Sequence, residues 1–241
     1  MRAGLAAALT VVASGCDIRA PGRPAPDSQV PRPDKVTSFD MLYAANCAGC
    51  HGPEGKGGAA MALRDPLYLA LADDATIRRV VSQGVPGTAM PAFAQSAGGM
   101  LTDEQVEAIV AGIRTRWAKP NAVQGVELPP YAARAAGDAK RGSSVYAAYC
   151  SSCHGANGRG GGRASSIVEG SFLALVSNQS LRTTVIVGRP ELGAPDFRGN
   201  VPGKPMSPDE VSDVVAWLAA QRPEVAGQPY PAPRAAVGER Q

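Results

Sequence analysis

This sequence has few histidines, few aromatic residues and no dense cluster of basic residues. Only two of its 241 residues are histidine, and aromatic residues make up 5% of the chain. Lysine and arginine never form a run of five or more, so the charge pattern of a nucleic-acid-binding segment is missing and we expect no nucleic-acid partner. The formal net charge of +3 favours no other class of partner.

Glycine and proline are abundant by contrast, at 28 and 21 residues, while 44% of the chain is hydrophobic. The length allows one domain or two small ones. Two small cores with long loops and proline-rich linkers would give this composition. Small domains bury little apolar surface and often depend on a metal or cofactor for stability.

Residues 1–15 are predicted to be a secretory signal peptide. Arg2 is followed by an apolar run of about 11 residues, which is too short to span a bilayer, and then by small residues. The segment Ala13–Gly15 before Cys16 resembles a bacterial lipobox, in which the cysteine is acylated and becomes the mature N-terminus. The alternative is plain secretion with a free thiol on Cys16.

Lipidation of Cys16 would make the protein an exported, membrane-anchored lipoprotein, because several acyl chains on one residue anchor stably. The resemblance to lipoproteins also gives Asp17 a meaning, since an aspartate after the cysteine often marks retention at the inner membrane. We therefore expect the chain on the periplasmic side of the inner (cytoplasmic) membrane. Residues 16–36 are rich in proline and are predicted to form a semi-rigid tether.

The chain repeats itself once. Leu42–Gly52 matches Val145–Gly155 at an offset of 103, and three further blocks match in the same order at offsets of 104 to 105. Four ordered blocks indicate a duplication, which predicts one domain over 37–120 and a second over 137–224. Residues 121–136 are then a linker containing proline and glycine, and the proline-rich tail 225–241 is expected to be disordered.

Both repeats carry the signals of helices and none of sustained alternation, so we predict an all-α fold. Thr102 and Ser207 are predicted to be N-caps of the last helix in each repeat, because acidic residues and a helical apolar spacing follow them. Another helix is expected before each cysteine pair. A third is expected over 74–83 and over 179–187.

Each repeat contains one C-x-x-C-H motif, and the two motifs use both histidines of the chain. Two cysteines one helical turn apart can both add to the vinyl groups of one porphyrin, and the adjacent histidine then lies under the iron. The motif therefore indicates covalent attachment of c-type haem, two groups in all. The residues are Cys47, Cys50 and His51 in the first repeat and Cys150, Cys153 and His154 in the second.

Three other interpretations of the cysteine pairs fit less well. A thioredoxin-like redox pair lacks its βαβ context here. A zinc site needs four ligands, and each repeat offers two cysteines and one histidine. A structural disulfide would leave both histidines unexplained.

The sixth iron position of an electron-transferring cytochrome is usually filled by methionine or histidine. Both histidines are already used, and Met90 follows His51 by 39 residues. With its CAGCHG motif, its Gly-x-x-Met-Pro-x-Phe string at Gly87–Phe93 and its amphipathic last helix, the sequence resembles the class I cytochrome c family. That resemblance implies that Met90 is the distal ligand of the first haem, the alternative being a methionine that fills the core.

The second repeat departs from this pattern, because Ala194 stands where Met90 stands in the first. Alanine cannot ligate iron. Met206 could swing in, although it aligns with Leu101. The sixth position could instead hold Lys204 or water, or stay open, and the sequence does not choose among these possibilities.

The resemblance implies a dihaem cytochrome that transfers electrons between redox partners of a periplasmic or respiratory-type chain. It would act as a carrier or as a subunit of a membrane complex, respiratory or photosynthetic, rather than as an enzyme with its own substrate. Two-domain lipoprotein cytochromes of this kind resemble haem subunits of quinol-oxidising complexes, terminal oxidases and periplasmic dehydrogenases. A dihaem peroxidase or a small-ligand sensor with an open second haem would be a different function, although Glu191 and Asp196 are the only carboxylates near Ala194 for acid–base chemistry.

Overall fold

The computed structural model describes residues 30–119, 121–161 and 163–223. The predicted signal peptide, the predicted lipidation site Cys16 and the predicted tail 225–241 lie outside the described residues. Of the described residues, 30–35 belong to one compact unit and those from 36 onward to a second. The first unit is described only at residues 30–35, where it contains the 3-10 helix η2 (Pro33–Lys35).

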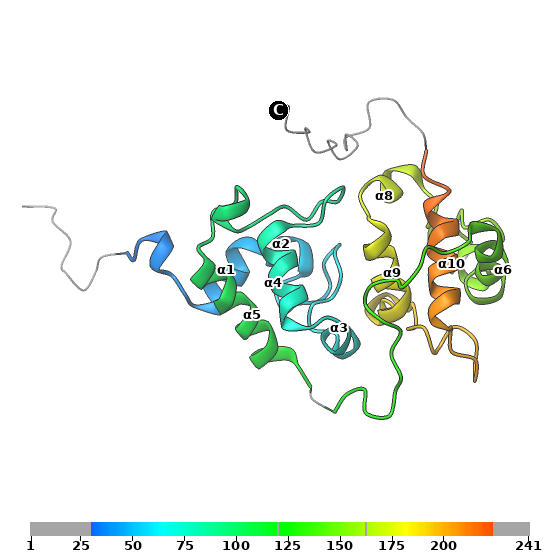
Figure 1. The fold of residues 1–241 in the computed structure, drawn as a ribbon, viewed down its shortest axis with the longest axis horizontal. Coiled ribbons are helices and arrows are strands. Elements are labelled where there is room, and N and C mark those ends of the chain that lie inside the picture. Colours follow the sequence, from blue (N-terminus) through cyan, green and yellow to red (C-terminus); the bar gives the residue numbers. More distant parts are fainter. Residues whose placement is uncertain (1–29, 120, 162, 224–241) are drawn as a thin grey trace, which may run out of the picture. The chain divides into compact units, whose positions relative to one another are not determined.

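The predicted all-α fold is confirmed: the described residues form helices and isolated β-bridges but no strand (Figure 1). None of the described helices is long and apolar enough to cross a membrane. The elements of the first repeat are α1 (Phe39–Asn46), α2 (Ala48–His51), α3 (Pro66–Leu71), α4 (Asp74–Gln83), η3 (Gln95–Ala97) and α5 (Asp103–Trp117). Those of the second are α6 (Ala139–Tyr149), α7 (Ser151–His154), α8 (Gly170–Ala174), α9 (Asn178–Val187), η4 (Pro190–Leu192) and α10 (Pro208–Ala219).

Both predicted N-caps of the last helices are confirmed, and each forms a full capping box. The Thr102 hydroxyl accepts from the Gln105 N–H at 3.2 Å, and the Gln105 side chain accepts from the Thr102 N–H at 3.0 Å. Ser207 and Glu210 make the same reciprocal pair. Two of the free N–H groups at each helix start are thereby satisfied, which fixes where α5 and α10 begin.

Two short helices, α3 and α8, were not predicted. Each begins at an acidic N-cap, Asp65 or Glu169, whose carboxylate accepts backbone N–H groups of the first turn. With 6 and 5 residues, these helices are too short for a periodic apolar pattern to be recognised. The acidic residue at each N-cap is the sequence signal that could have predicted these two helices.

In each repeat the first and last helices cross at a glycine. A Cβ on Gly112 of α5 would lie 2.1 Å from the ring of Phe39 on α1. In the second repeat the glycine lies on the first helix instead of the last. A Cβ on Gly142 of α6 would lie 2.0 Å from the carbonyl oxygen of Asp213 on α10. Figure 1 shows α10 lying alongside α6, and this pair makes the most extensive helix–helix contact of the described residues.

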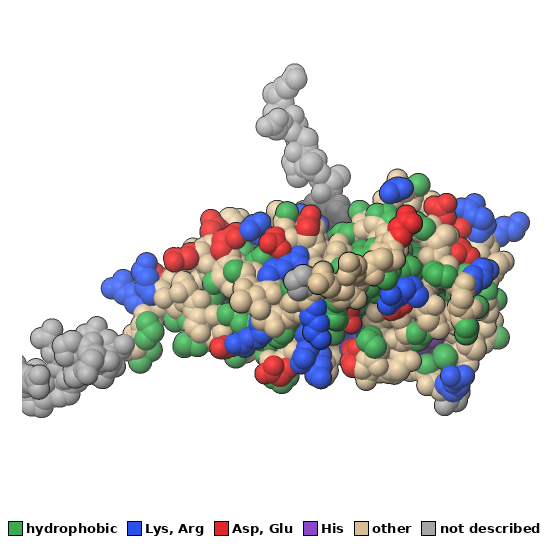
Figure 2. Space-filling model, turned by 90° about the horizontal axis from the view of Figure 1, so that it is seen from below, with side chains coloured by type: hydrophobic (Ala, Val, Ile, Leu, Met, Phe, Trp, Pro, Cys, Tyr) green, Lys and Arg blue, Asp and Glu red, His purple; other side chains and the backbone are tan. Residues whose placement is uncertain are grey.

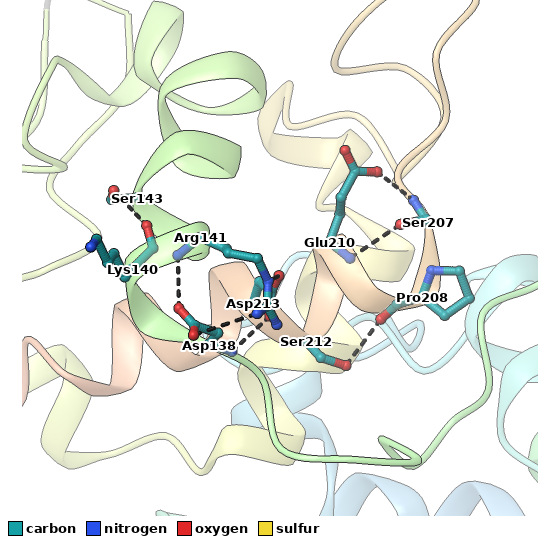
Figure 3. A network of polar contacts seen from close by, with 9 residues as sticks. All are labelled: Asp138, Lys140, Arg141, Ser143, Ser207, Pro208, Glu210, Ser212 and Asp213. Carbon is teal, nitrogen blue, oxygen red and sulfur yellow. Dashed lines mark hydrogen bonds and ion pairs between the residues drawn. The ribbon is translucent and has the colours of Figure 1, made fainter.

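A polar network ties the start of α6 to the middle of α10 (Figure 3). The Asp213 carboxylate accepts from the Asp138 N–H at 2.7 Å and from the Arg141 guanidinium at 2.8 and 2.9 Å. The Asp213 side chain is only 7% exposed. The hydrogen bond from Arg141 lowers the pKa of Asp213 despite its burial, so the carboxylate is held in its ionised form.

The C-terminal half of the predicted linker lies against the second repeat. Arg182 of α9 is 2% exposed and donates to the carbonyl oxygens of Pro130, at 2.9 Å, and Tyr131, at 3.1 Å. Gln179 adds a bond of 2.8 Å to the same Tyr131 carbonyl. The carbonyl groups of this irregular segment thus have partners, as buried backbone requires.

Candidate haem-attachment sites

The cysteines of each motif lie at a one-residue break between two helices. Cys47 ends α1 and precedes α2, with φ −118°, and Cys150 stands in the same way between α6 and α7, with φ −120°. The second cysteine and the histidine of each motif then lie on the short helix. The two breaks therefore have the same backbone geometry.

A glycine directly follows each histidine, and the structure gives it a specific reason. Gly52 and Gly155 have φ of 82° and 77°, a region that other residues rarely adopt. A Cβ on Gly52 would also lie 1.8 Å from the carbonyl oxygen of Lys56. The chain therefore turns sharply back after each motif, which a larger residue would prevent.

A buried tyrosine fixes this turn in both repeats. The Tyr43 hydroxyl donates to the carbonyl oxygen of Gly52 at 2.7 Å, and Tyr146 donates to that of Gly155. Burial raises the pKa of Tyr43 to about 12, so the hydroxyl keeps its proton at neutral pH. The motif alone does not predict these hydrogen bonds, although each tyrosine stands four residues before the first cysteine of its motif.

The two imidazoles are oriented by backbone carbonyl groups. Nδ1 of His51 lies 2.7 Å from the carbonyl oxygen of Met61, and Nδ1 of His154 lies 2.9 Å from that of Ser165. A carbonyl oxygen can only accept, so Nδ1 carries the proton and Nε2 keeps a free lone pair. Burial lowers the pKa of His51, with the Met61 hydrogen bond acting in the opposite direction. Both rings thus have the tautomer that binds a metal through Nε2.

The four motif cysteines are free thiols. Burial, followed by the neighbouring cysteine, raises the pKa of both Cys47 and Cys150 to about 11. Among the described residues, no three side chains of His, Cys, Asp or Glu come together so as to hold a metal ion by themselves. The donor set of each motif, two free thiols and one imidazole with a free Nε2, fits covalently attached haem.

The loop that carries Met90 follows α4 in the first repeat. The Val85 N–H donates to the Met90 carbonyl oxygen at 3.0 Å. The Thr88 hydroxyl donates to the Val85 carbonyl oxygen at 2.8 Å and accepts from the Met90 N–H at 3.1 Å. Met90 is half-buried at the end of this closed loop.

The corresponding loop of the second repeat is closed at the same two positions. The Arg189 N–H donates to the Ala194 carbonyl oxygen at 2.9 Å, as Val85 does to Met90. A second bond runs back from the Ala194 N–H to the Arg189 carbonyl oxygen at 3.0 Å. The closing bond of the loop is thus retained, while the second loop contains the 3-10 helix η4 and has alanine in place of Met90.

Met206 occupies the structural position of Leu101. Its N–H donates to the Phe197 carbonyl oxygen at 2.9 Å, and the Leu101 N–H donates to the Phe93 carbonyl oxygen at 2.7 Å. Met206 is 2% exposed and belongs to the hydrophobic core. Lys204 is exposed, with Nζ 5.4 Å from the centre of the Tyr149 ring, a cation–π geometry.

Two curated relatives are named as subunits of cbb3-type cytochrome c oxidase. The chain is 30% identical over 134 residues to the cbb3-type cytochrome c oxidase subunit FixP of Sinorhizobium medicae (strain WSM419), covering 52% of this chain and 40% of that protein. It is 31% identical over 87 residues to the cbb3-type cytochrome c oxidase subunit CcoP of Rhodobacter capsulatus, covering 34% of this chain and 29% of that protein. The chain thus matches less than half the length of either relative.

Among solved structures, a chain of the Kuenenia stuttgartiensis reducing HAO-like protein complex aligns with a TM-score of 0.45 and 20% identity, covering 80% of this chain and 100% of that chain. The family model of cytochrome c oxidase, cbb3-type, subunit III matches twice, over residues 34–111 and 137–218. Each match contains one C-x-x-C-H motif. The chain belongs to this family and is a tandem, two-domain cytochrome c that carries two covalently bound haem c groups.

Proposed function

We propose that this protein is a membrane-anchored electron-transfer component in which two haems, one in each domain, pass electrons between redox partners. The observation that carries the proposal is the repeated arrangement of two free thiols and a carbonyl-oriented imidazole at His51 and His154. In this proposal Cys47 and Cys50 hold the first haem, and Cys150 and Cys153 hold the second. The haem supplies the one-electron couple.

The chain's own residues hold and orient each group. Nε2 of His51 and the thioether of Met90 are the proposed iron ligands in the first domain, and Nε2 of His154 is the proposed ligand in the second. The Met61 and Ser165 carbonyl oxygens fix the two imidazole rings. In the first domain, two fixed ligands would keep the coordination the same in both oxidation states, which would favour rapid electron transfer.

The proposed partners are components of a membrane respiratory complex, because the relatives are named as subunits of cbb3-type cytochrome c oxidase. On the face that Figure 2 shows, Lys and Arg side chains are interspersed with Asp and Glu, and neither sign dominates. That face favours no partner by its charge alone. We propose a lipid on Cys16 as the membrane anchor, with the haem domains on the periplasmic side.

Covalent haem content is the first test. The full chain is produced with the c-type haem maturation machinery, together with the double variants Cys47→Ser/Cys50→Ser and Cys150→Ser/Cys153→Ser. We expect haem that survives denaturation in the wild-type chain, and about half of that amount in each double variant. A redox titration should then give reversible one-electron steps. Absence of covalent haem from both motifs would overturn the proposal.

The anchor is tested separately by Cys16→Ser. We expect the wild-type protein in the membrane fraction and the variant in the soluble periplasmic fraction, with unchanged haem content. A variant that stays in the membrane fraction would show that the anchor is not a lipid on Cys16.

A peroxidase function is less well supported by the described contacts. Both carboxylates near Ala194 are ion-paired, Glu191 with Arg189 and Asp196 with Arg198. Burial alone would raise the pKa of Asp196, but the Arg198 hydrogen bonds outweigh it and lower the pKa. A carboxylate held ionised in this way is a poor proton donor.

A further inference from the structure

We propose that the second domain leaves the distal side of its haem iron without a side-chain ligand, so that this position binds a small diatomic molecule such as carbon monoxide or nitric oxide. The inference rests on the proposed attachment of the second haem through Cys150, Cys153 and His154. It concerns what that haem can bind beyond electron transfer.

The first step concerns position 194, which lies at the same point of the loop as Met90 but has no side-chain atom that could bind iron. The same backbone hydrogen bond closes both loops, from Val85 to Met90 and from Arg189 to Ala194. In each domain a glycine with φ near 70°, Gly84 or Gly188, begins the loop. Ala194 therefore stands where the first domain presents a thioether, but its methyl group cannot coordinate iron.

The second step is that Met206 is committed to the core. It is 2% exposed, and its N–H is bonded to the Phe197 carbonyl oxygen. The next residue, Ser207, is the N-cap of α10 and is locked in a capping box with Glu210. Turning Met206 toward an iron would remove a buried side chain from the core and disturb this cap, which costs stability at both places.

The third step is that no other suitable donor lies in the loop. Residues 188–206 contain no histidine, no cysteine and no methionine except Met206. Lys204 is directed at the Tyr149 ring, 5.4 Å from its centre.

The chemical consequence is a difference between the two domains in ligand binding. A haem with two firm protein ligands has no position for an added molecule. A haem with one protein ligand has a free position, or at most a displaceable water, and in the ferrous state it binds neutral diatomic molecules. Such binding would stabilise the ferrous state of the second haem alone, by mass action.

The test is a carbon monoxide titration of the reduced holoprotein, followed by absorption spectroscopy after haem content has been measured. We expect about half of the haem in the wild-type chain to bind carbon monoxide. The oxidised wild type should show the weak far-red band of a methionine–ferric haem bond at one haem only.

Three variants make the test specific. Ala194→Met should abolish carbon monoxide binding and add a second methionine–haem band, because it restores the donor of the first domain. Met90→Ala should allow both haems to bind. Met206→Leu, which introduces the residue found at the matching position 101, should change neither signal. Helical circular dichroism and haem content check that each variant is folded.

The proposal is overturned if the wild type, with both haems attached, binds no carbon monoxide. It is equally overturned if Met206→Leu removes a methionine–haem band, or if Lys204→Ala is needed before the second haem binds. Absence of covalent haem would instead reject the proposed function, so the two failures are distinguishable.

Discussion

The two domains form the same crossing of first and last helix with the large and small residues exchanged. In the first domain Phe39 of α1 packs on Gly112 of α5, and in the matching positions of the second domain Gly142 of α6 packs beside Trp217 of α10. Each crossing therefore joins one aromatic residue with one glycine. The close approach of the two helices is therefore retained. The bulky side chain comes from the first helix in one domain and from the last helix in the other.

The tryptophans of the two domains also reach equivalent places from different positions. Trp117, the last residue of α5, lies 2.8 Å from a Cβ built on Gly55, and Trp217, near the end of α10, lies 3.4 Å from one built on the matching Gly158. Trp117 meets the ring of Tyr43 edge-on at 5.1 Å. Trp217 instead stacks on Tyr146 at 4.2 Å. Both domains thus cover the turn after the haem motif with one indole.

Arginine shows a third exchange of this kind. Arg114 of α5 donates to the carbonyl oxygens of Leu69 and Ala72 at the end of α3. In the second domain Arg222, beyond the end of α10, donates to the matching carbonyls of Leu173 at 3.1 Å and Val176 at 2.9 Å. The free carbonyls of a short helix need a partner, and its place in the sequence can move.

The largest expected effect comes from removing the indole of each domain in turn. Trp117→Ala should lower the free energy of unfolding of the first domain by about 3–5 kcal/mol, because this buried ring packs against Tyr43 and Phe39. Trp217→Ala should cost the second domain less, since its ring is half-exposed. Denaturant unfolding with domain-resolved hydrogen exchange measures both. A larger loss in the second domain would contradict the comparison.

The exchange of large and small residues can be tested by introducing the second domain's arrangement into the first domain. Gly112→Trp alone should destabilise the first domain by about 1–3 kcal/mol, because its new side chain meets the Phe39 ring. Adding Phe39→Gly should recover part of this loss, with a positive coupling in the double-mutant cycle. Purely additive losses would show that the two crossings are not interchangeable.

Two arginines at matching positions should differ in their importance. Arg182→Ala should cost about 1–3 kcal/mol, because the carbonyls of Pro130 and Tyr131 lose their charged donor. It should also raise hydrogen exchange and proteolysis in residues 128–136. Arg78→Ala is the control, since Arg78 pairs only with Glu107 on the surface, and it should have little effect on stability. Equal effects would mean that the linker contact contributes nothing.

The smallest expected effect near neutral pH is a contribution of Asp213 to the acid sensitivity of the second domain. The pKa of Asp213 is lowered in the folded protein, chiefly by the Arg141 hydrogen bond. The stabilisation is therefore complete above the unfolded-state pKa of about 3.9 and is lost as the pH falls through the lower folded-state value. Ala108 occupies the matching position of the first domain, which should lack this term.

Unfolding measured across acid pH with domain-resolved hydrogen exchange checks that expectation. Asp213→Asn should reduce the acid-dependent loss of stability in the second domain, where the lowered pKa values of Glu169 and Asp196 remain, and should leave the first domain unchanged. An acid-dependent loss in the second domain that is as large in the variant as in the wild type would show that Asp213 is not the cause.

Much of the helical layout followed from the sequence. The helix predicted over 74–83 coincides with α4, and the one predicted over 179–187 differs from α9 by one residue at its start. Periodic apolar residues and capping signals act locally, so they can be read without the fold. The short helices α3 and α8 escaped prediction because they offer too few residues for a period.

The orientation of the two imidazoles could not be predicted, and the reason is chemical. The partners of His51 and His154 are the backbone carbonyls of Met61 and Ser165, and every residue has such a carbonyl. Nothing in the identity of a methionine or a serine indicates that its carbonyl will receive an imidazole proton. Only the turn that follows each motif brings these atoms together.

The sequence by itself determined the haem chemistry, because the order and spacing of the two cysteines and the histidine along the chain do not depend on the rest of the fold. It also determined the duplication and the absence of a methionine at position 194. Only the tertiary structure decided that Met206 belongs to the core and that the volume at the two helix crossings is exchanged. Packing of this kind depends on residues about seventy to eighty positions apart meeting at one point, and no local pattern records such a meeting.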